Sequence, residues 1–116
     1  MHEKTKTQVT FDRHDDAVTA SLTGRVGEED ALRLEKDLVG LCEDGAVKIV
    51  IDLSGVSLIG SAGLGAFMAA FKICKPQGGY VRLVAPQPLV RQVLLTTKLN
   101  RLFGLYDTIE DARAAT

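Results

Sequence analysis

Hydrophobic and polar positions along the chain alternate between a strand-like and a helix-like period. The first two apolar segments, QVTF (8–11) and AVTASLTG (17–24), are rich in β-branched residues typical of strands. The polar stretch DRHDD (12–16) between them is typical of a turn. The pattern therefore predicts an antiparallel hairpin, with His14 as a solvated turn residue.

Longer segments follow the helical period of three to four residues and predict helices within 27–46, 63–79 and 88–99. Gly45 marks the stop of the first, and Pro76 with Gly78-Gly79 ends the second. The expected buried stripes are Ala31, Leu34, Leu38, Leu41 and Cys42 in the first helix, Leu64, Phe67, Met68, Phe71 and Cys74 in the second, and Leu89, Val90, Val93 and Leu94 in the third. A terminal helix is predicted over 108–115, with Thr108 and Asp111 in a capping arrangement.

Short apolar runs between these helices predict strands over 47–55 and 80–86, and a further short strand near 102–107. The element order is then ββαβαβαβα. Strands linked through helices pair in parallel with right-handed crossovers. We expect a single α/β domain over 1–116, with helices packed against a small mixed sheet whose centre is mostly parallel.

Composition narrows the function classes. Of 116 residues, 46% are hydrophobic and 25% charged, and the net charge is -1. The basic residues are scattered, aromatic residues make up 5% and there is no Trp, which argues against a nucleic-acid partner. The start of the chain, MHEKTKTQ (1–8), has no apolar leader, and no apolar run approaches membrane-spanning length. We therefore expect a cytoplasmic protein without membrane insertion.

Cysteine and histidine usage gives no indication of a metal site or cofactor. Cys42 and Cys74 fall in different predicted helices, and His2 and His14 lie near the start of the chain. Both cysteines are expected to be small buried residues in a reducing compartment.

The candidate site is LIGSAGLG (58–65), which follows a predicted parallel strand and opens a helix. A phosphate-binding P-loop would need a lysine after the glycines, and a nucleophile elbow would need glycine at the position of Ile59. With no histidine nearby as a base for Ser61, serine catalysis has no support. The chain is therefore not expected to be an enzyme.

Two interpretations of Ser61 stay open. As an N-cap it would accept a hydrogen bond from a backbone N–H near residues 63 or 64, while Gly63 and Gly65 allow close approach of helix and sheet. On an exposed loop it could also carry a phosphoryl group, which the free N–H groups and the helix dipole would stabilise.

The chain resembles the STAS-domain family, and within it the bacterial anti-sigma factor antagonists. The matching segments are LTG (22–24), VKIVIDLSGVSLI (47–59), SAGLG (61–65), GGYVRLVAP (78–86) and LVRQVLLTTKLNRLFGLYDTIEDA (89–112). The resemblance implies that Ser61 is the phosphoacceptor. It also implies a partner-binding loop made of Gly24, Arg25, Ser57, Gly60, Ala62, Gly63, Leu64 and Gly65.

The resemblance further implies a cycle of partner exchange. The unmodified protein would bind an anti-sigma factor with serine kinase activity and so release a sigma factor. Phosphorylation of Ser61 would end that complex, and a metal-dependent phosphatase would restore it. The chain departs from the family pattern where Gly60 and Gly27 replace aspartates, Arg25 replaces an acid and Ala62 replaces a hydroxyl residue.

Two other functions remain. A constitutive STAS adaptor in a lipid transporter or a stress-signalling scaffold would not depend on phosphorylation, and the absence of the aspartate at Gly60 motivates it. A small-molecule or nucleotide-binding domain is the third, because glycine loops at strand ends can cradle phosphates.

Overall fold

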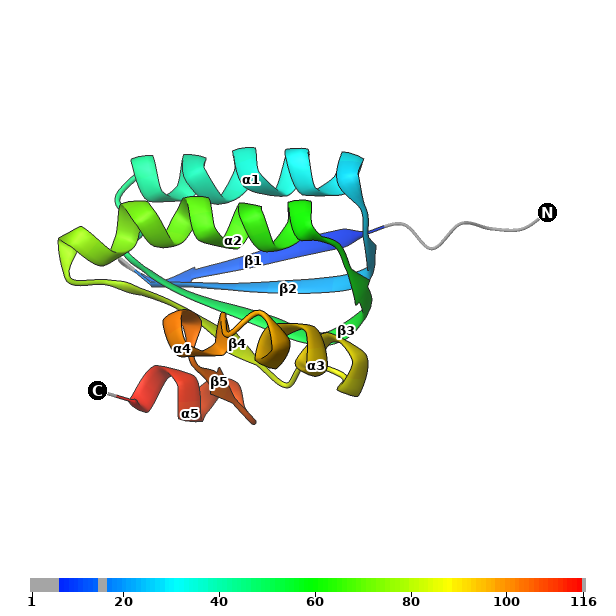
Figure 1. Ribbon diagram of the computed structural model, residues 1–116. Helices are drawn as coiled ribbons and strands as arrows, with labels where there is room; N and C mark the ends of the chain where they lie inside the picture. The colour runs from blue at the N-terminus through cyan, green and yellow to red at the C-terminus, as the bar shows by residue number, and fades with distance from the viewer. Residues whose placement is uncertain (1–6, 15–16, 116) are drawn as a thin grey trace.

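The computed structural model describes residues 7–14 and 17–115, apart from the side chain of His14 (Figure 1). The elements are β1 (Gln8–His14), β2 (Ala17–Val26), α1 (Glu28–Glu43), β3 (Lys48–Ile59), α2 (Ser61–Cys74), the 3₁₀ helix η1 (Lys75–Gln77), β4 (Tyr80–Val84), α3 (Pro88–Thr96), α4 (Asn100–Phe103), β5 (Leu105–Tyr106) and α5 (Ile109–Ala114).

The strands form one five-stranded sheet in the order β1-β2-β3-β4-β5. β1 and β2 are antiparallel, and each later strand is parallel to the one before it. The predicted hairpin and mixed sheet are thus confirmed. Because the strand order never reverses, right-handed crossovers place every connecting helix on the same face of the sheet.

The core reflects this one-sided arrangement. The larger apolar cluster lies between the sheet and the connecting helices, and it joins Leu34 of α1, Phe67 of α2, Leu94 of α3 and Phe103 of α4. On the other face, α5 follows the last strand and packs Ala112 against strands β3 and β4. The part of that face formed by β1 and β2 has no helix over it in Figure 1.

Alternation along β3 shows how the sequence builds both faces. Ile49 and Ile51 belong to the larger cluster, whereas Val50 between them belongs to the smaller one. Successive strand side chains point to opposite faces, so a continuous apolar run is the pattern expected of a strand buried on both sides.

Three strands extend beyond their predicted ends, and one of them is β2, which reaches Val26. The polar residues 12–14 belong to β1 and pair with 17–19, so the backbone of His14 lies in a strand instead of the turn. Residues 15–16, where the rest of that turn was expected, fall outside the described part, as does His2. β3 continues to Ile59 because it follows β2 through two register shifts.

The expectation of a strand near 102–107 is only partly right. Phe103 ends the short helix α4, and only Leu105–Tyr106 pairs with β4. The helical turn buries the Phe103 ring, whose centroid is 6.2 Å from that of Phe67 and 5.8 Å from that of Phe71. An aromatic contact made by tertiary packing therefore overrides the local strand pattern.

Five residues of the expected stripes are not fully buried, and three of them, Met68, Phe71 and Val93, still pack against the core. Leu89 is 56% exposed, and Leu41 is half-buried. Helix α3 buries Val90 and Leu94. A helix turns by about 100° per residue, so Leu89 lies beside this face. Predicted boundaries differ as well, since α2 begins at Ser61 and ends at Cys74.

Candidate functional site

Ser61 is the first residue of α2, and its side chain is exposed. It lies at the end of the sheet where the parallel strands have their C-termini, here called the C-terminal edge. The cap position belongs to Gly60, which is extended (φ -95°, ψ 178°) and has no side chain to bond the helix. Its carbonyl accepts from the N–H groups of Gly63 at 3.1 Å and Leu64 at 3.2 Å. The prediction that Ser61 caps the helix is therefore wrong, because the helix starts one residue earlier than a serine cap requires.

The N-terminus of α2 is left open as a result. The first N–H groups of a helix have no partner inside it, and α2 has neither a side-chain cap nor an acidic residue in its first turn. The N–H groups of Ser61 and Ala62 therefore remain available at the positive end of the helix dipole. This is a favourable position for an added anion.

The two glycines of α2 differ in what they do. A Cβ on Gly63 would lie 2.7 Å from Cγ1 of Ile59 and 3.0 Å from Cγ1 of Val26, so glycine is needed for close packing there. A Cβ on Gly65 would meet nothing within 4 Å. The expected role in close approach is confirmed for Gly63 and wrong for Gly65, which is exposed.

Only some of the residues proposed for partner binding can present a side chain. Arg25 and Ser57 are exposed on the ends of β2 and β3, where Arg25 pairs with Leu58, itself 39% exposed. Leu64 is only 8% exposed and points into the core. Gly24 is buried and has a φ of 95°, a conformation that glycine adopts readily. Leu64 and Gly24 therefore contribute to the packing and backbone course at this edge but offer a partner little contact surface.

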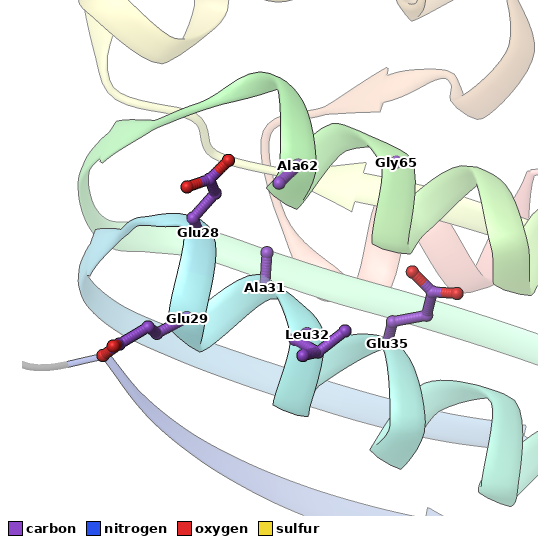
Figure 2. A pocket seen from close by; sticks show the side chains of 7 residues that line it. All are labelled: Glu28, Glu29, Ala31, Leu32, Glu35, Ala62 and Gly65. Carbon is purple, nitrogen blue, oxygen red and sulfur yellow. The ribbon is translucent and has the colours of Figure 1, made fainter.

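The structure adds a groove that the sequence reasoning missed. It has a volume of about 500 Å³ and lies between the first halves of α1 and α2 (Figure 2). Its lining residues are Glu28, Glu29, Ala31, Leu32, Glu35, Ala62 and Gly65. Leu32 is 66% exposed, so the groove combines apolar surface with carboxylates. The spacing of Glu28, Leu32 and Glu35 places them on one side of α1, but only the packing shows that α2 lies alongside.

The two helix N-termini at this edge have different electrostatics. The first turn of α1 carries Glu28, Glu29 and Asp30, which balance its dipole. The first turn of α2 carries no acid. At this edge, the N-terminus of α2, which has no acidic residue and carries the exposed Ser61 hydroxyl, therefore contrasts with the acidic N-terminus of α1.

In the part of the chain that the structure describes, neither a histidine backbone nor a metal-binding cluster lies near Ser61. The backbone of His14 pairs with Ala17, at the far end of β2 from Ser61. Among residues 7–13 and 17–115, no three His, Cys, Asp or Glu side chains could hold a metal ion together. The described helices are also too short or too polar to cross a bilayer. The group that this edge exposes is the hydroxyl of Ser61.

Comparison with known proteins identifies the family. Residues 8–112 match the model of the STAS domain. The anti-sigma-B factor antagonist of Bacillus subtilis is 33% identical over 105 residues, which cover 88% of this chain and 87% of that protein. A Thermotoga maritima relative is 40% identical over 68 residues, a match that spans 59% of this chain and only 60% of that relative.

Solved structures agree with this assignment. The anti-sigma factor antagonist from Mycobacterium paratuberculosis superposes with a TM-score of 0.83 at 30% identity, covering 93% of this chain and 92% of that one. SpoIIAA has the same fold in its unphosphorylated form (TM-score 0.82, 19% identity, covering 91% of this chain and 93% of that one). Its phosphorylated form from Bacillus has it too (TM-score 0.74, 18% identity, covering 91% and 96%). The chain described here belongs to the STAS domain family.

Proposed function

We propose that this protein is an anti-sigma factor antagonist that binds, when unmodified, an anti-sigma factor with serine kinase activity in the cytoplasm. Phosphorylation of Ser61 ends the complex, and a metal-dependent phosphatase resets it. The observation that carries the proposal is the exposed Ser61 hydroxyl, which caps no helix although it lies at the open N-terminus of α2. Relatives that cover most of this chain are anti-sigma factor antagonists, which supports the same partner class.

The proposed modification is a phosphoryl transfer in which the chain is the substrate. The Ser61 oxygen attacks the terminal phosphorus of ATP, a new P–O bond forms, and the bond to ADP breaks. The hydroxyl proton passes to a base that the kinase supplies. The product carries about -1.5 to -2 charges. The free N–H groups of Ser61 and Ala62 and the dipole of α2 stabilise these charges.

Release of the partner follows from size and desolvation. Gly60 and Ala62 flank the hydroxyl and have no bulky side chain, so a partner surface can fit closely against this loop. A phosphoryl group on Ser61 would occupy the space that this surface fills. Burying its charge without full compensation is costly, so the complex is expected to separate.

The modification site is tested with the kinase that the chain captures. A Ser61→Ala chain used as bait isolates the bound kinase, which is then incubated with each variant, Mg²⁺ and ATP. Intact-mass measurement should show one phosphoryl group on the wild type and none on Ser61→Ala. Ser54→Ala is the matched control because Ser54 is also an exposed serine, on β3, and lies outside the expected partner-binding loop, so it should be modified like the wild type. Equal modification of Ser61→Ala would exclude the site.

The switch itself is tested by affinity. Ser61→Asp should weaken binding to the captured kinase by roughly tenfold or more, equivalent to about 1.4 kcal/mol, while Ser61→Ala should bind like the wild type. Equal affinities would contradict the switch. Stable recovery of transporter or scaffold subunits that Ser61→Asp does not disturb would instead support the constitutive adaptor. A thermal shift with nucleotides that Ser61→Asp abolishes would support a nucleotide-binding role of the glycine loop.

A further inference from the structure

At the other end of α2 from Ser61, three cationic residues from separate elements are among those that line one small cavity. Lys75 of η1, Arg82 of β4 and Arg101 of α4 surround a volume of about 190 Å³. Much of the remaining lining is aromatic, with Tyr80 and Tyr106 among it, and none of the lining residues that the structure describes is an acid. The cavity therefore concentrates positive charge in a protein whose net charge is -1.

Arg82 is held in place before any ligand arrives. Its guanidinium carbon lies 3.7 Å from the ring centroid of Tyr80 and 5.8 Å from that of Tyr106. One terminal nitrogen, Nη1, donates to the carbonyls of Ala112 at 2.7 Å and Ala115 at 2.8 Å. Nε and Nη2 have no acceptor among the residues that the structure describes. A guanidinium fixed in this way can offer its remaining donors to an anion at little entropic cost.

Lys75 and Arg101 are the other two cationic residues that line the cavity. Both side chains are exposed, and neither has a carboxylate partner among the residues that the structure describes. Like charges that share one cavity repel each other, and the repulsion grows as water is displaced by low-dielectric groups such as the ring of Phe103. A bound anion would remove this repulsion and make charge-assisted hydrogen bonds with all three cations.

We propose that this cavity is a binding site for a small phosphate-bearing anion. The positively charged lining selects a ligand with several negative charges, and Arg is suited to bidentate contact with phosphate oxygens. The volume is below the ~300–1,000 Å³ of typical drug-sized pockets, so the phosphoryl or pyrophosphoryl group itself fills it. This site does not depend on Ser61 or on the function proposed above.

Amide chemical shifts measured by NMR during titration with pyrophosphate test the site. Sodium chloride at matched ionic strength is the reference. Saturable shifts are expected in residues 75–82 and 101–106. Titration with inorganic phosphate and with a nucleoside diphosphate distinguishes the source of the phosphate. Tighter binding of the nucleotide than of pyrophosphate would identify a nucleotide ligand, whereas equal or weaker binding would identify a free phosphate compound.

Matched substitutions decide whether the cavity is responsible. Arg101→Gln and Lys75→Gln should each lower pyrophosphate affinity by roughly tenfold, since each removes one charge-assisted contact. Both side chains are exposed, so the fold should remain intact. Arg91→Gln, which removes an exposed arginine on α3, is the control and should bind like the wild type. Absence of saturable shifts, shifts that chloride reproduces, or equal affinity of Arg101→Gln and Arg91→Gln would overturn the proposal.

Discussion

The two ends of helix α2 present similar side chains in opposite environments. Ser61 at the start is exposed and makes no cap, whereas Cys74 at the end is fully buried. The sulfur of Cys74 lies 3.5 Å from that of Cys42 and 3.9 Å from the carbonyl oxygen of Ala46. Burial, together with the hydrogen bond and the charge interaction with Cys42, raises the pKa of the Cys74 thiol to about 12. One helix therefore displays a hydroxyl at one end and conceals a protonated thiol at the other.

This difference shows that packing, more than residue type, decides which group is available for chemistry. A thiol is intrinsically the better nucleophile, but only its thiolate reacts readily, and burial suppresses that form here. The expectation that both cysteines are buried is confirmed. The weaker nucleophile, Ser61, is the one that a partner enzyme can reach.

The largest expected effect on stability concerns Gly79, which lies beyond the buried end of α2. A Cβ at Gly79 would lie 1.7 Å from the carbonyl oxygen of Val47, a backbone atom that cannot move aside without breaking the contact between β3 and β4. Gly79→Ala should lower the free energy of unfolding by at least about 4 kcal/mol. Urea denaturation followed by circular dichroism measures it.

Gly65→Ala is the matched control at the exposed end of α2. Its Cβ would enter open space, and alanine favours a helix over glycine by up to about 1 kcal/mol. The same substitution should thus change stability in opposite directions at the two ends. A loss at Gly65 as large as that at Gly79 would contradict the comparison.

The next effect is a loss of stability in alkali caused by the buried thiol. The folded-state pKa of Cys74 is raised from 9.0 to about 12, so the unfolded chain releases this proton first as the pH rises. Stability should be unaffected by this group below about pH 9 and should then fall by about 1.4 kcal/mol per pH unit, or roughly 3 kcal/mol by about pH 11.

Chemical denaturation across this pH range, compared with Cys74→Ala, isolates the contribution of the thiol. The variant should lose stability less steeply between about pH 9 and pH 11, although it starts from a lower value because a buried group has been removed. Parallel pH profiles for the two proteins would show that Cys74 does not titrate as its burial requires.

The smallest effect compares Ser61 with a hydroxyl that does cap a helix. Thr108 Oγ1 accepts a hydrogen bond from the N–H of Asp111 at 3.0 Å, which confirms the predicted capping arrangement of α5. Thr108→Ala should therefore cost about 1 kcal/mol, whereas Ser61→Ala should stay within about 0.5 kcal/mol. Thermal or urea unfolding of the two variants measures the difference. Equal losses would mean that Ser61 supports the helix after all.

The contrast between Ser61 and Thr108 also shows where prediction from sequence ends. Each hydroxyl residue precedes an apolar helical pattern, so the sequence favours a cap at both. The chain reaches α2 directly from the long strand β3, and Gly60, whose N–H donates to the carbonyl of Val26, takes the cap position. This placement depends on the register between β2 and β3, which local sequence does not specify.

The sequence by itself determined the order of the principal strands and helices, the mixed sheet and the strand-to-helix junction where Ser61 lies. These features follow from hydrophobic periods and turn residues, which act over a few neighbouring positions. Only the tertiary structure decided the groove between α1 and α2, the contact of the two cysteines and the gathering of Lys75, Arg82 and Arg101. These residues are distant in sequence and meet only because the sheet and its helices bring their elements together.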